Sequence, residues 1–171
     1  MEIQENIINK VAESGLMTID LANHAPTAAI RIYDIKENLF HGLILKEKDF
    51  RAFIKEHDWS QYSQQHVGII CSADAIVPTW AYMLLTTKIS DYALSIHFGN
   101  EETVRNMLFE QNLNNIDYSL FQDQRVVVKG CGDIDIPESA FVTFTANLYK
   151  VAKSVMYGEP CSTVPVFKRK T

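Results

Sequence analysis

The residues of this chain best suited to chemistry are its three cysteines. Cys71, Cys131 and Cys161 are the only thiols among its 171 residues. Thiolates bind zinc and hold iron–sulfur clusters, so three of them gathered in space would form most of a metal site. Because no C-x-x-C pair occurs in the sequence, only the fold could bring these cysteines together.

Each cysteine stands near the end of a predicted strand. Cys71 ends the apolar run "HVGIIC", Cys131 follows the run "RVVVKG", and Cys161 comes shortly after the run "AKSVMYG". The carboxyl ends of parallel strands meet at one edge of a sheet, and open α/β sheets bind ligands at that edge. We therefore expect the three thiols to share one sheet edge.

A fourth ligand is available at the same edge. Asp74 and Asp133 fall in the loops after the first two of these strands, and His97 stands near the end of a further strand. Three thiolates with one carboxylate or imidazole would complete a four-coordinate zinc or iron site. The predicted metal ligands are Cys71, Cys131, Cys161, Asp74, Asp133 and His97.

Two other interpretations of the cysteines remain open. Free cysteine is among the most buried residue types, so Cys71 is also compatible with a plain core position, the aspartates then being loop formers. Alternatively, Cys131 or Cys161 is the nucleophile of a thiol enzyme, which needs a base or a positive charge beside it. Cys131 lies between two glycines, and glycines allow a ligand to approach the backbone closely.

An internal repeat determines where these residues fall. Residues 58–99 align with residues 117–158 without a gap, at a constant offset of 59. Identical pairs include Asp58/Asp117, Pro78/Pro137 and Gly99/Gly158. A run of such landmarks in register indicates duplication of one supersecondary unit.

Both copies have the same order of predicted elements. An aromatic entry leads into a buried apolar strand, a polar loop with an aspartate, and a proline that suits the first turn of a helix. A short strand ending at glycine follows, so each copy is a β-α-β crossover with parallel strands. The sequence therefore predicts an α/β protein with a mainly parallel sheet and flanking helices, built from an internal duplication of a β-α-β unit.

The remaining residues complete the domain. Apolar periodicity predicts a helix over 3–12, strands over 16–22 and 28–35, and an amphipathic helix over 47–57. The predicted parts are an N-terminal segment (1–57) that completes the core and a duplicated region (58–171) made of copy one (58–99), a linking helix (100–113), copy two (117–158) and a C-terminal tail (159–171).

Composition limits the partners of the chain. It is 47% hydrophobic and 22% charged, as in ordinary globular proteins. With 16 basic and 21 acidic residues its net charge is -5, which argues against sequence-independent binding of nucleic acid. No apolar run is long enough for a bilayer, and no signal-peptide pattern begins the chain. We expect a cytoplasmic protein that binds neither nucleic acid nor membrane, with a protein partner or a homo-oligomer still open.

Several stretches resemble one bacterial family, catalogued as domain of unknown function 2480. They are "LILKEKDFR", "HDWSQY", "CSADAIVPTWAYMLL", "VVVKGC" and "MYGEPCSTVPVFKR", and the resemblance covers nearly the whole chain. The family has no established activity. Its association with iron–sulfur cluster assembly genes implies a role in metal, cluster or thiol traffic.

Three functions follow as hypotheses. The first is a non-catalytic metal-binding protein, with zinc or iron as the metal, accessory to iron–sulfur cluster or metal homeostasis. The second is a protein-interaction or scaffold module with buried structural cysteines. The third is a cysteine-dependent thiol enzyme.

Overall fold

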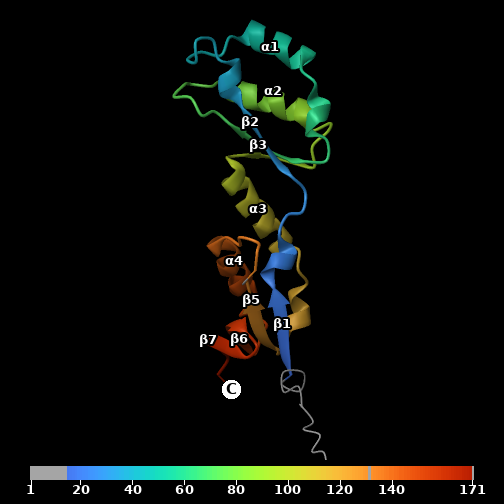
Figure 1. The fold of residues 1–171 in the computed structure, drawn as a ribbon, viewed down its shortest axis with the longest axis vertical. Coiled ribbons are helices and arrows are strands. Elements are labelled where there is room, and N and C mark those ends of the chain that lie inside the picture. Colours follow the sequence, from blue (N-terminus) through green and yellow to red (C-terminus); the bar gives the residue numbers. More distant parts are fainter. Residues whose placement is uncertain (1–14, 131, 171) are drawn as a thin grey trace, which may run out of the picture. The chain divides into compact units, whose positions relative to one another are not determined.

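The computed structural model describes residues 15–130 and 132–170. The predicted helix over 3–12 and Cys131 lie outside these residues. The described chain forms two compact units (Figure 1). Unit 1 consists of the chain up to Ala25 and from Phe109 onward, and unit 2 consists of Pro26–Leu108.

Unit 2 contains a three-stranded parallel sheet. Its strands are β2 (Ile30–Asp34), β3 (His66–Ile70) and β4 (Ser95–Phe98), in the order β2-β3-β4. Helices α1 (Glu47–Glu56) and α2 (Thr79–Ile89) lie entirely within this unit (Figure 1).

The sequence of unit 2 explains these elements. The alternating side chains of β3 bury Val67 and Ile69, and α2 begins after Pro78, which cannot donate a hydrogen bond but suits a helix start. The amphipathic α1 buries Phe50 and Ile54, so its apolar stripe faces the core that these strands form.

Unit 1 contains a four-stranded sheet. Its strands are β1 (Leu16–Asp20), β5 (Arg125–Lys129), β6 (Ser154–Glu159) and β7 (Ser162–Lys168), in the order β1-β5-β6-β7. The first three strands are parallel, and β7 returns antiparallel to β6. Helix α4 (Glu138–Leu148) buries Ala140, Phe144 and Leu148 in the core of this unit.

Helix α3 (Glu101–Asn114) belongs to both units. Its first half ends with unit 2 at Leu108, and its second half begins unit 1 at Phe109. Val104 and Phe109 are both fully buried. One helix therefore contributes apolar side chains to each unit.

In the part of the chain that the structure describes, four short 3-10 helices follow aspartates. These are η1 (Leu21–His24), η2 (Ile35–Asn38), η3 (Trp59–Tyr62) and η4 (Tyr118–Phe121). In each, the preceding aspartate accepts a hydrogen bond of 3.0 Å from the backbone N–H two residues later. These side chains stabilise the turn because they take the place of a backbone acceptor.

The predicted α/β class is confirmed, with four α-helices and mostly parallel strands over residues 15–130 and 132–170. The expected single sheet is wrong, because the chain forms two sheets. The physical reason is the pairing of the first two strands: β1 pairs with β5 and β2 pairs with β3, so each sheet buries its own apolar residues. Strand β7 lies within residues 159–171, for which the sequence predicts no element.

Candidate ligand-binding site

The predicted metal ligands are divided between the two sheets. Cys71 follows β3 in unit 2 and is half-buried, and its thiol donates a weak hydrogen bond to the Ala73 carbonyl at 3.6 Å. Cys161 is exposed in the turn between β6 and β7 of unit 1. The expectation that these thiols share one sheet edge is therefore wrong, because they follow strands of different sheets.

The carboxylates do not complete a metal site within the described chain. Asp74 and Asp133 are both exposed in loops. Over residues 15–130 and 132–170, no group of three or more His, Cys, Asp and Glu is arranged to hold a metal ion. The role of Cys131 stays a prediction, since that residue lies outside the part described.

His97 contacts a hydroxyl instead of a thiol. Its Nε2 lies 2.8 Å from Ser95 Oγ, and that oxygen lies 2.7 Å from His66 Nδ1. Burial lowers the pKa of both imidazoles, and the neighbouring His66 lowers the pKa of His97 further. The three side chains link β3 to β4 as a neutral hydrogen-bonded chain.

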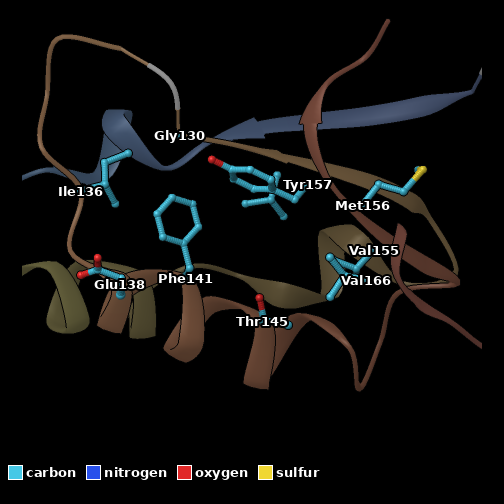
Figure 2. Close-up of a pocket in the computed structure, with 10 residues that line it drawn as sticks. Gly130, Ile136, Glu138, Phe141, Thr145, Val155, Met156, Tyr157 and Val166 are labelled. Carbon is cyan, nitrogen blue, oxygen red and sulfur yellow. The ribbon is translucent and has the colours of Figure 1, made fainter. Parts of the chain in front are cut away.

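An open cavity of about 520 Å³ lies in unit 1 (Figure 2). It lies beside the carboxyl end of β5 and the middle of β6, along the face of α4 that carries Glu138, Phe141 and Thr145. Val128 and Val155 line it from the two strands, Phe141 and Thr145 from the helix, and Val166 from β7. The walls are therefore mostly apolar.

The glycine at the end of β5 shapes this cavity. A side chain at Gly130 would overlap the Phe141 ring, whose Cε1 atom would lie 2.8 Å from an added Cβ. Without a side chain there, the ring lies between Ile136 and Tyr157 (Figure 2). The rings of Phe141 and Tyr157 meet edge to face, with centroids 5.7 Å apart and an angle of 82°.

A few polar groups join these apolar walls. Glu138 is the first residue of α4, where the helix dipole favours a carboxylate. Thr145 directs its hydroxyl towards the strands, and Tyr157 carries its phenol across the cavity (Figure 2). An ion pair of 2.8 Å between Lys129 and Glu159 joins the ends of the same two strands. The cavity can therefore accept a hydrogen bond from a bound molecule while enclosing an apolar body.

Unit 2 has a much smaller cavity with a similar composition. Its volume is about 120 Å³, and its walls include Tyr82, Thr86 and Phe98. Every residue that lines it stands 59 positions before a residue that lines the cavity of unit 1. Cys71 occupies the position that Gly130 has in unit 1. Burial raises the pKa of Tyr82, and the nearby Cys71 and Asp34 raise it further.

The sequence predicts ligand chemistry at strand ends, and the unit 1 cavity lies beside the end of β5, but its walls are formed by other residues than those predicted. The sequence predicts ligand chemistry at the cysteines, whereas the residues that line the unit 1 cavity include Phe141, Thr145 and Tyr157. A usable signal was present in α4, because Phe141 and Thr145 form a second helical stripe beside Ala140, Phe144 and Leu148. Gly130, directly before Cys131, is a second sequence signal of this cavity.

The fold and the cavity define a small α/β protein with a candidate binding site beside the carboxyl end of the parallel strand β5. In the described residues, no helix has the length and apolar character needed to cross a membrane. The family described as Protein of unknown function (DUF2480) matches residues 5–169, and the chain belongs to this family. The resemblance seen in the sequence is thereby confirmed. No curated protein and no solved structure is significantly similar to the chain.

Proposed function

We propose that the chain is a non-catalytic binding protein that holds a small, largely apolar molecule in the cavity of unit 1. The observation that carries this proposal is the open cavity of about 520 Å³ with mostly apolar walls. Volumes of about 300–1,000 Å³, with apolar walls and a few oriented polar groups, are typical of small-molecule sites. Its place beside the carboxyl end of β5 supports the same function.

The lining indicates the chemistry of the ligand. Phe141 and Tyr157 favour a flat apolar body, which can pack against aromatic rings. The Glu138 carboxylate accepts hydrogen bonds and carries a negative charge, so it favours an amine or hydroxyl at one end of the ligand. An anionic end would be repelled by the same carboxylate.

The ligand class can be tested with aromatic fragments. Amines such as phenethylamine should shift the backbone amide NMR signals of Gly130, Glu138 and Thr145 in a saturable way, more strongly than phenylacetate does. Thr145→Leu fills the cavity with a larger side chain and should weaken binding about tenfold or more.

Thr86→Leu is the matched control, because Thr86 stands at the corresponding position of α2 and lines the small cavity of unit 2. It should leave the shifts in unit 1 unchanged. If no fragment gives saturable shifts at the unit 1 cavity, or if Thr145→Leu binds as well as the wild type, the proposal is wrong.

We also propose that the chain arose by internal duplication. Spacing supports this: η3 and η4, β3 and β5, and α2 and α4 each begin 59 residues apart and have equal lengths. The N-terminal segment contributes a second repeat, since β1 with η1 precedes β2 with η2 by 14 residues. Each copy, residues 58–99 and residues 117–158, would then take one strand from the segment 1–57.

The metal-binding role predicted from the cysteines, with a place in iron–sulfur or metal homeostasis in the cytoplasm, stays a prediction. It depends on Cys131. Elemental analysis of the wild type and of Cys131→Ser, both purified without oxygen, tests this role directly. Equal metal content in the two proteins would contradict it. For the scaffold alternative with buried thiols, Cys71 is half-buried and packs against the core of unit 2, whereas Cys161 is exposed.

A further inference from the structure

Unit 2 contains a second cavity whose walls are aromatic. Its volume is about 420 Å³, and it lies along β2, between η2 and the end of α1. Four of the residues that line it carry rings: Tyr33, Phe53, His57 and Tyr62. This cavity is separate from the unit 1 cavity and includes none of its residues.

The rings form one continuous cluster. The centroids of Tyr33 and Tyr62 are 6.3 Å apart, and those of Phe53 and His57 are 4.8 Å apart. The faces of aromatic rings carry negative potential and attract cations within about 6 Å of the centroid. The chain already uses this property, because the Arg31 guanidinium lies 5.3 Å from the centroid of Tyr62.

Carboxylates add negative charge to the same cavity. Asp34 and Glu37 both line it. Burial acts against the charge of Asp34, but hydrogen bonds from Ser72 and from the Lys36 backbone lower the pKa of that carboxyl, so it remains ionised. Among the described residues, Glu37 makes no ion pair that would compete with a ligand.

Two positive side chains near the cavity have partners within the chain, but Arg31 keeps its charge because its acceptor is the neutral amide of Gln61. Arg31 donates a hydrogen bond of 2.8 Å to Gln61, and the Lys36 ammonium lies 3.7 Å from Asp34. Burial lowers the pKa of His57, and Arg31 lowers it further despite the opposing effect of Asp58. The imidazole inside the cavity is therefore neutral at neutral pH.

We propose that this aromatic cavity, lined by Tyr33, Phe53, His57 and Tyr62 with Glu37 at its side, binds a small organic cation such as a quaternary ammonium. The faces of the aromatic rings attract the cation, and the Glu37 carboxylate adds a negative charge beside it. A neutral molecule of the same shape gains only the apolar contacts.

Comparison of choline with its neutral carbon analogue, dimethylbutanol, separates the attraction of the positive charge from the apolar contacts. Trp59 reports binding through its fluorescence, because its ring lies 5.9 Å from Tyr33 and 4.4 Å from His57. A Trp80→Phe background removes the second tryptophan signal. Choline should bind about tenfold or more tightly than dimethylbutanol, which is the difference expected for desolvated cation–π contacts.

Glu37→Gln removes the charge from an exposed side chain and should weaken choline binding about threefold without changing dimethylbutanol binding. Glu56→Gln, on the exposed face of α1, is the control and should change neither. Equal affinity for choline and dimethylbutanol would overturn the proposal, as would the absence of saturable choline binding. An unchanged choline affinity in Glu37→Gln would remove the role of that carboxylate and with it the proposed site.

Discussion

At the residue scale, Gly130 controls the position of the Phe141 ring. Gly130→Ala places a Cβ against that ring, so the side chain or the strand end must move. We expect a loss of about 1–3 kcal/mol in the free energy of unfolding, as for other overpacked positions. Urea denaturation measures it.

Gly132→Ala serves as the matched control, because an added Cβ there meets nothing within 4 Å. Its free energy of unfolding should stay within about 0.5 kcal/mol of the wild type. If both alanine variants were equally stable, the close contact between Gly130 and the Phe141 ring would not matter for stability.

The histidine chain of unit 2 makes stability depend on pH. The folded state lowers the pKa of His66 and of His97. The unfolded state therefore binds more protons as the pH falls below about 6.5, and the stabilisation present above that pH is lost on acidification. We expect the free energy of unfolding to fall between about pH 7 and about pH 5.

Replacing one titrating histidine should make the free energy of unfolding depend less steeply on pH. His97→Gln removes an imidazole, so its stability should change less between the same two pH values. The aspartates with lowered pKa, Asp34, Asp58 and Asp117, lose their contribution only at lower pH, near and below about 4. If the free energy of unfolding depended on pH equally in His97→Gln and the wild type, His97 would not contribute to this pH dependence.

At the element scale, β7 stabilises unit 1 through one face. Phe167 packs on the core of this unit and contacts Tyr149 with a centroid distance of 5.8 Å, whereas Val164 on the same strand is 61% exposed. Phe167→Ala should lower the free energy of unfolding by about 2–4 kcal/mol. Val164→Ala should change it by less than about 0.5 kcal/mol.

Thermal or urea unfolding of the two variants provides the comparison. The choice of two positions on one strand removes general effects of strand propensity, because both substitutions introduce alanine. If Phe167→Ala were as stable as Val164→Ala, β7 would contribute pairing but no core contacts.

Elements were predicted well where the apolar pattern was strong. The predicted helix over 47–57 corresponds to α1 at Glu47–Glu56, because Phe50 and Ile54 recur at helical spacing. The strands predicted over 16–22 and 28–35 are β1 and β2. Their partners could not be predicted, since alternation shows that a strand has a buried face but not which strand it pairs with.

At the scale of the whole molecule, the cores of the two units share no residue. The sequence predicted one sheet because two copies of a β-α-β unit can extend a common sheet as readily as form two. The deciding fact was the separation of β1 from β2, which lie close in the sequence but join different sheets. The expectation of a common sheet edge for Cys71 and Cys161 is wrong for the same reason, because these residues follow strands of different sheets.

Separate cores predict local effects of core substitutions. Leu85 and Phe144 stand at corresponding positions of α2 and α4, and both are fully buried. Leu85→Val should speed amide hydrogen exchange in β3 and β4, and Phe144→Leu should speed it in β5 and β6. In each case the free energy of opening measured by exchange should fall by about 1 kcal/mol. Val142→Ala, at a position 68% exposed, is the control and should alter neither sheet. If either core substitution raised exchange equally in both sheets, the two cores would unfold as one cooperative unit, and the division into separate units would not hold in solution.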